Sequence, residues 1–124
     1  MQDGKYVILC VDDDEDILFV LKQILEANDY IYAGAASGEE GLKAYDETSP
    51  DLIILDLMME EVDAGTSFVK ELKLRNNTAP IFLLSSVGDS MAEMVDYSDL
   101  GLAGVLQKPI SSEQLLSLLK NKLG

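Results

Sequence analysis

The sequence predicts an α/β domain in which a doubly wound, five-stranded parallel sheet carries helices on both faces. Two observations predict this class. Short apolar runs alternate with amphipathic helical patterns five times along the 124 residues. The runs are apolar at nearly every position rather than at every second one, which indicates strands buried on both faces. Right-handed crossovers between parallel strands then place helices on both sides of the sheet.

The five expected strands are these apolar runs. The first, KYVILCV, is nearly all apolar and rich in β-branched residues, and DLIIL and IFLL repeat its character. The second strand, YIYAGA, has a weaker pattern, and the fifth, AGVLQ, has the weakest. The strands are expected at 5–11, 30–35, 51–55, 81–84 and 103–107.

Helical patterns fill the intervals, with apolar residues recurring at spacings of three and four. Ser37 and Glu40 have the spacing of a capping box at the start of the second helix, and Ser111 and Gln114 have it before the last. The fourth pattern is the least regular. The helices are expected at 15–28, 38–48, 65–76, 91–100 and 115–123.

Length and composition exclude several classes of protein. The length is that of one domain, and we expect residues 1–124 to form it. The 23 acidic residues against 9 basic ones, a net charge of −14, argue against direct binding to nucleic acid or to an anionic membrane. No apolar run approaches the roughly 18 residues of a membrane span. The lone Cys10 cannot form an internal disulfide, which fits a reducing, cytoplasmic setting.

Histidine is absent, so catalytic triads, Cys–His nucleophiles and histidine metal sites are excluded within this chain. The remaining chemistry lies in polar side chains at the ends of four expected strands. They are Asp12, Asp13, Asp56, Ser85 and Lys108. Because ligands of doubly wound sheets bind beyond the carboxyl ends of the strands, we expect these side chains to converge on one edge.

Carboxylates crowded within about 5 Å repel each other by on the order of 3 kcal/mol a pair at an effective dielectric near 20. A hard divalent cation held by oxygens relieves this repulsion, and Mg²⁺ suits a site with few carboxylates and a phosphate-bearing ligand. A carboxylate can also attack phosphorus to give an aspartyl phosphate. A lysine and a hydroxyl would then stabilise the phosphoryl oxygens. Asp56 needs no general base for this attack, since it is already ionised.

Two neighbouring residues have simpler interpretations. Asp14 lies at the expected start of the first helix, where an acid caps backbone N–H groups and meets the positive end of the helix dipole. We therefore expect a structural role for Asp14. Cys10 is expected to be a buried, unreactive side chain.

The whole chain resembles the receiver domain of two-component response regulators. Each motif is weak alone, but four in this order at these strand ends are highly specific. The resemblance implies a fold like that of the chemotaxis regulators, a flavodoxin-like sheet of strand order 2-1-3-4-5. The motifs are Val11-Asp12-Asp13, Asp51 to Met59, Pro80 to Ser85, and Lys108-Pro109.

The resemblance also implies a role for each acidic residue. Asp56 would be the phosphoacceptor, charged by a sensor histidine kinase or a phosphotransfer protein. Asp13 would bind Mg²⁺ directly, Asp12 would bind it largely through water, and the backbone carbonyl of Met58 would complete the protein ligands.

By the same resemblance, Ser85 and Lys108 would bind the phosphoryl group, helped by the backbone N–H groups of Leu57 and Ser86. The sequence departs from the family pattern at Val105, which occupies the place of an aromatic switch residue. The loop after Asp56 departs as well. The activation signal is therefore expected to reach the fourth helix and fifth strand in a different way.

The resemblance implies a phosphorylation-switched signalling domain that catalyses only its own phosphorylation and dephosphorylation. Its partner-binding face would comprise the fourth helix, fifth strand and fifth helix, directed at an unknown output partner or output domain; a homodimer through this face is left open. One alternative is a pseudo-receiver that binds partners without phosphorylation, which Val105 favours. Another is a small Mg²⁺-dependent aspartyl phosphohydrolase, which Met58 disfavours because such enzymes carry an acid at that place.

Overall fold

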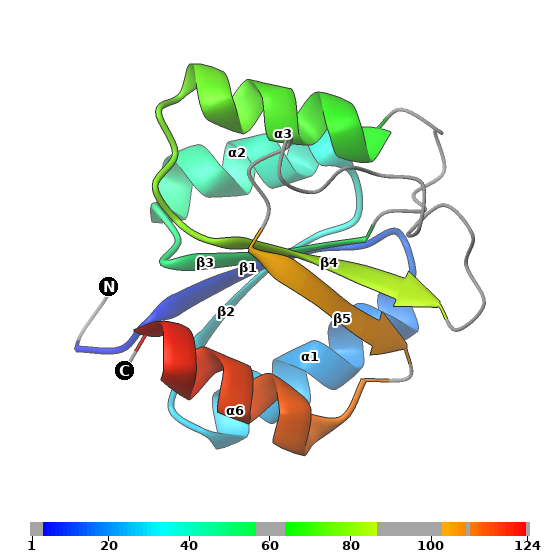
Figure 1. The fold of residues 1–124 in the computed structure, drawn as a ribbon. Helices are drawn as coiled ribbons and strands as arrows, with labels where there is room; N and C mark the ends of the chain where they lie inside the picture. Colours follow the sequence, from blue (N-terminus) through cyan, green and yellow to red (C-terminus); the bar gives the residue numbers. More distant parts are fainter. Residues whose placement is uncertain (1–3, 57–63, 87–102, 109, 124) are drawn as a thin grey trace.

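The computed structural model describes residues 4–56, 64–86, 103–108 and 110–123. In this part of the chain, five parallel strands form one sheet in the order β2-β1-β3-β4-β5. Helices cover both faces (Figure 1). The predicted fold class and strand order are therefore confirmed.

The observed elements agree with the expected ranges to within a few residues. The strands are β1 (Val7–Val11), β2 (Ile31–Ala35), β3 (Leu52–Asp56), β4 (Ile81–Ser86) and β5 (Gly104–Lys108). The helices are α1 (Glu15–Ala27), α2 (Gly38–Thr48), α3 (Ala64–Leu74) and α6 (Ser112–Leu123). The helix expected at 91–100 lies outside the described residues.

The apolar runs form strands because both of their faces are covered. All residues of β1 and β3 are buried. Alternate side chains enter two separate cores: Leu9 and Ile53 pack toward α2 and α3, while Ile8 and Ile54 pack toward α1 and α6. The weaker β2 is only partly buried, in keeping with its place at the edge of the sheet.

Short polar contacts fix where the helices begin. The Asp14 carboxylate accepts a backbone N–H of the first turn of α1 at 2.9 Å, which confirms its predicted capping role. Ser37 caps α2, and Glu40 reaches back to accept the N–H of Ala36 at 3.0 Å, one residue before the usual capping box. The Ser111 hydroxyl likewise accepts an N–H at the start of α6, at 3.3 Å.

Hydrogen bonds at both ends of β1 hold it in place. At its amino end, the Asp51 carboxylate accepts the N–H of Val7 at 2.8 Å. At its carboxyl end, the N–H of Asp12 donates to the carbonyl of Ala35 at 3.0 Å. The residue that follows β1 is therefore tied to the sheet by its own backbone.

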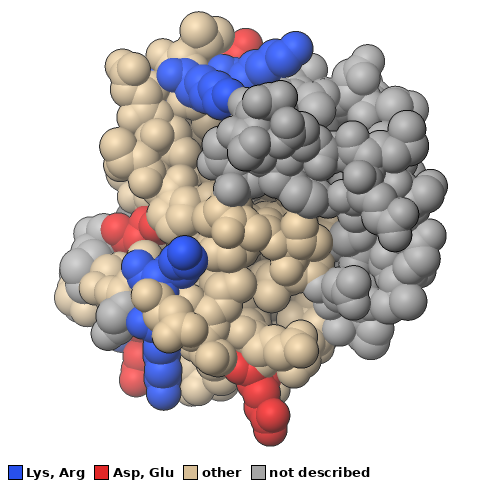
Figure 2. All heavy atoms as spheres, viewed as in Figure 1, with Lys and Arg blue, Asp and Glu red and all other residues tan. Residues whose placement is uncertain are grey.

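Charge is distributed unevenly over the helices. On the face shown in Figure 2, basic side chains lie over α3 and near the end of α6, with uncharged surface between them. The sequences of α1 and α2 hold seven acidic and two basic residues, whereas those of α3 and α6 hold two acidic and four basic ones. The helices that pack against β2 are therefore the acidic pair.

Close packing between α2, α3 and β1 depends on Gly41. A Cβ atom at this position would lie 2.8 Å from Cε2 of Phe68 and 3.0 Å from Cγ2 of Val11. Gly41→Ala is expected to lower the free energy of unfolding by about 1 kcal/mol, because about 1–3 kcal/mol of overpacking exceeds about 1 kcal/mol of gained helix propensity. Urea denaturation would measure the change.

The control is the same change in a Phe68→Leu background, where the smaller side chain leaves room for the new methyl group. There Gly41→Ala should be neutral or stabilising, so that the two substitutions are strongly non-additive. Additive effects would contradict the packing argument.

Candidate functional site

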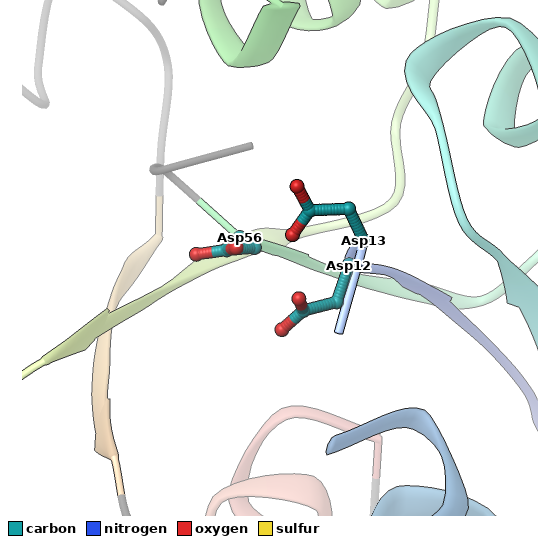
Figure 3. A group of neighbouring side chains, drawn as sticks. All are labelled: Asp12, Asp13 and Asp56. Carbon is teal, nitrogen blue, oxygen red and sulfur yellow. The ribbon is translucent and has the colours of Figure 1, made fainter. Parts of the chain in front are cut away.

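Three carboxylates meet at the carboxyl edge of the sheet. Asp12 and Asp13 follow β1, and Asp56 is the last residue of β3, the strand next to it. Their side chains extend to the same side of the strand ends (Figure 3), and one carboxylate oxygen from each lies within 4.8 Å of the others. The structure thus brings together the three acids that the sequence placed at this edge.

The three acids differ in exposure. Asp12 is fully buried and Asp56 is 3% exposed, whereas Asp13 is exposed. At this separation each pair of charges repels by on the order of 3 kcal/mol at an effective dielectric near 20. The repulsion weighs most on the two buried groups, while Asp13 leaves the cluster open to solvent on one side.

The backbone of the loop orients the Asp12 side chain. Its Oδ1 accepts the N–H of Asp14 at 2.9 Å, so the residue that caps α1 also positions Asp12. Sequence reasoning assigned only the cap to Asp14. An aspartate that accepts an N–H two residues further on is a known local turn, and that spacing is the signal that could have predicted the contact.

The donor set fits Mg²⁺. All three side chains offer hard carboxylate oxygens, and three protein carboxylates leave room for the water and phosphate oxygens that Mg²⁺ prefers. The opposite charge of the ion would offset the mutual repulsion of the acids. Asp12, Asp13 and Asp56 could therefore hold a magnesium ion together.

The backbones of Ser85, Ser86 and Lys108 reach the same edge. Asp56 pairs with Leu84, so Ser85 and Ser86, the last two residues of β4, continue past the level of Asp56. Ser86 in turn pairs with Lys108, the last residue of β5. What the structure describes of Ser85, Ser86 and Lys108 is the backbone. Leu57 and Met58 lie outside the described residues.

Cys10 lies in β1, two residues before Asp12, and its side chain is completely buried. Burial, together with the negative charge of Asp12, raises the pKa of the thiol far above its ordinary value. A protonated thiol is a poor nucleophile and a poor metal ligand. The prediction that Cys10 fills space in the core is confirmed.

Val105, at the predicted switch position, lies on the outer strand β5 with 37% of its surface exposed. It lines a groove of about 740 Å³ between β5 and α6, together with Phe82, Leu106 and Leu118. The groove lies on the face predicted to bind partners.

Among the helices that the structure describes, none is long and apolar enough to cross a bilayer.

The fold and the site define a class of protein. The family model for the response regulator receiver domain matches residues 8–120. The chain belongs to this family, and the resemblance noted from the motifs is confirmed.

Individual relatives agree with this assignment. The chain is 33% identical over 113 residues to the alkaline phosphatase synthesis transcriptional regulatory protein PhoP of Bacillus subtilis, covering 91% of this chain and 46% of PhoP. It is 34% identical to the response regulator MprA of Mycobacterium leprae, with coverage of 91% and 49%. The chain spans about half the length of the curated relatives it matches.

Solved structures show the same architecture. The chemotaxis protein CheY4 of Vibrio cholerae superposes with a TM-score of 0.85 at 29% identity, covering 97% of this chain and 100% of CheY4. A putative response regulator from Chloroflexus aurantiacus gives a TM-score of 0.85 at 30% identity, with coverage of 97% and 98%.

Proposed function

We propose that this chain is the phosphoacceptor domain of a two-component system, and that Asp56 takes a phosphoryl group with the help of Mg²⁺. The observation that carries the proposal is the cluster of Asp12, Asp13 and Asp56, with carboxylate oxygens within 4.8 Å of one another. The chain then acts as a switched signalling domain. It is not a turnover enzyme, because each modification ends on its own side chain.

The transfer begins with a phosphohistidine on a partner, since this chain has no histidine. A carboxylate oxygen of Asp56 attacks the phosphorus, the new O–P bond forms as the N–P bond breaks, and the electron pair returns to the imidazole of the donor. Mg²⁺ would supply charge neutralisation for the phosphoryl oxygens. Asp12 and Asp13 would hold the ion, and the exposed side of Asp13 is open to the donor.

Ser85 and Lys108 would bind the phosphoryl oxygens through the hydroxyl and the ammonium group, helped by the N–H groups of Leu57 and Ser86. The carbonyl of Met58 would be a further metal ligand. Support comes from the strand ends: β4 and β5 finish at the edge that holds Asp56. These roles rest on the family resemblance and on that register.

The partners follow from the same chemistry. A sensor histidine kinase or a phosphotransfer protein would donate the phosphoryl group. Phosphorylation would shift a two-state equilibrium toward a form that an output domain or a separate output partner prefers. We place the output face on β5, α6 and the helix expected at 91–100, where Val105 is partly exposed. A homodimer through this face and a cytoplasmic location stay predictions.

The test is the intact mass of the protein after incubation with acetyl phosphate and Mg²⁺. Wild type should gain one phosphoryl group and Asp56→Ala none, while Asp14→Ala, a nearby acid outside the cluster, should still be modified. An unmodified wild type would contradict the proposal and favour a phosphorylation-independent interaction domain. Steady release of phosphate from phosphate esters would instead favour a hydrolase.

A further inference from the structure

β2 is an outer strand of the sheet, and among the described residues no strand pairs with it on the side away from β1. The strand pairs with β1 without interruption from Val7↔Ile31 to Val11↔Ala35, so no bulge disturbs it. Its helical neighbours α1 and α2 lie on opposite faces of the sheet (Figure 1).

The hydrogen bonds to β1 show which backbone groups point outward. The N–H of Ile31 donates to Tyr6, and the carbonyl of Ala35 accepts from Asp12, so residues 31, 33 and 35 face β1. In a parallel pair, alternate residues bond to opposite sides. The N–H and C=O groups of Tyr32 and Gly34 therefore point away from the sheet.

Within Ile31–Ala35 this edge has no charged side chain, no proline and no bulge. Natural sheets blunt an outer strand with charged side chains, proline or a bulge, and Ile31–Ala35 reads IYAGA. Gly34 is exposed. The Tyr32 ring lies where a side chain at position 34 would begin, so any residue other than glycine would displace it. The backbone at Gly34 is thus accessible to another chain.

The surroundings of the edge are acidic. Glu26 belongs to α1, which packs against β2. Burial, the Cys10 thiol and the negative charge of Glu26 together raise the pKa of Tyr32 to about 12. Glu40 accepts the N–H of Ala36 just beyond the end of β2. These residues belong to α1 and α2, the acidic pair of helices. A strand added here would find carboxylates on both faces of the sheet.

We propose that the β2 edge binds an extended segment of a partner protein that carries basic side chains, which adds as a sixth strand. Its backbone would pair with Tyr32 and Gly34, and its lysine or arginine side chains would reach Glu26 and Glu40. A second copy of this chain fits poorly, because each copy carries a net charge of −14. The inference is independent of the proposed phosphorylation.

The probe is a short synthetic peptide in which pairs of lysines alternate with pairs of valines, so that lysines point to both faces of an added strand, titrated into the ¹⁵N-labelled protein. The amide signals of Tyr32 and Gly34 should shift most, and their hydrogen exchange should slow. N-methylation of alternate peptide residues removes the N–H groups on one edge of the added strand. Two such peptides are compared, one methylated at the odd-numbered and one at the even-numbered residues. The peptide whose methyl groups face β2 should bind about tenfold more weakly or worse, while the other should bind like the unmethylated peptide.

Protein variants separate strand addition from general attraction to an acidic protein. Glu26→Gln and Glu40→Gln should weaken binding and reduce its salt dependence, and Glu40→Gln keeps an acceptor for the Ala36 N–H. The matched control, Glu113→Gln on α6, should leave binding unchanged. Equal binding of both N-methylated peptides, an equal effect of Glu113→Gln, or no binding would overturn the proposal. So would concentration-dependent shifts of Tyr32 and Gly34 without peptide, which would identify a second copy as the occupant.

Discussion

Magnesium is expected to raise the free energy of unfolding of the wild-type protein by about 2.7 kcal/mol at a hundredfold excess over its dissociation constant. The physical reason is that the cluster of Asp12, Asp13 and Asp56 exists only in the folded state, so the ion binds the native protein in preference to the unfolded chain. Thermal or urea denaturation with Mg²⁺, compared with the same experiment in a chelator, measures the effect.

Asp13→Ala should abolish this response while leaving the core intact, because Asp13 is exposed and contributes to the site rather than to the packing. Asp14→Ala is the matched control. It removes the cap of α1, at a cost of about 1 kcal/mol, but it should keep the full magnesium response. A wild-type protein that Mg²⁺ does not stabilise, or an Asp13→Ala variant that responds like wild type, would show that the acids do not form a metal site.

The sheet could be predicted from sequence because its strands are buried on both faces. The run of β1 has no polar position and that of β3 has only Asp56 at its end, and this pattern distinguishes a central parallel strand from an edge strand. The site followed from the same reasoning, since Asp12, Asp13 and Asp56 come at strand ends that topology brings together. The positions of the acids along the sequence were sufficient to predict the site, because the parallel sheet brings the ends of its strands together.

Contacts between distant side chains were not predictable in this way. The close approach of Gly41 to Phe68 joins α2 to α3, and the hydrogen bond of Asp51 to Val7 joins two strands across 44 positions of the chain. No periodicity encodes either contact, because each depends on how the finished elements pack. The outer edge of β2 is similar. The sequence indicated a weak strand, but only the register shows that the backbone N–H and C=O groups of Gly34 point away from the sheet.

Asp56→Asn is expected to stabilise the metal-free protein, by about 1–2 kcal/mol, while abolishing phosphorylation. Asparagine keeps the shape of the side chain and removes one of three charges whose oxygens lie within 4.8 Å of one another. Each pair repels by about 3 kcal/mol before screening, and the exposure of Asp13 reduces its share. Urea denaturation in the presence of a chelator measures the gain.

Asp51→Asn is the matched control, because it makes the same change at the opposite edge of the sheet. Asp51 accepts the N–H of Val7, and asparagine can still accept it, but within the described part of the chain Asp51 belongs to no cluster of three acids. Asp51→Asn should therefore give no stabilisation. If Asp56→Asn in chelator were no more stable than wild type, the repulsion between the acids would be too weak to drive metal binding. In Mg²⁺ the order should reverse, since the variant loses a charged ligand that the wild-type protein keeps.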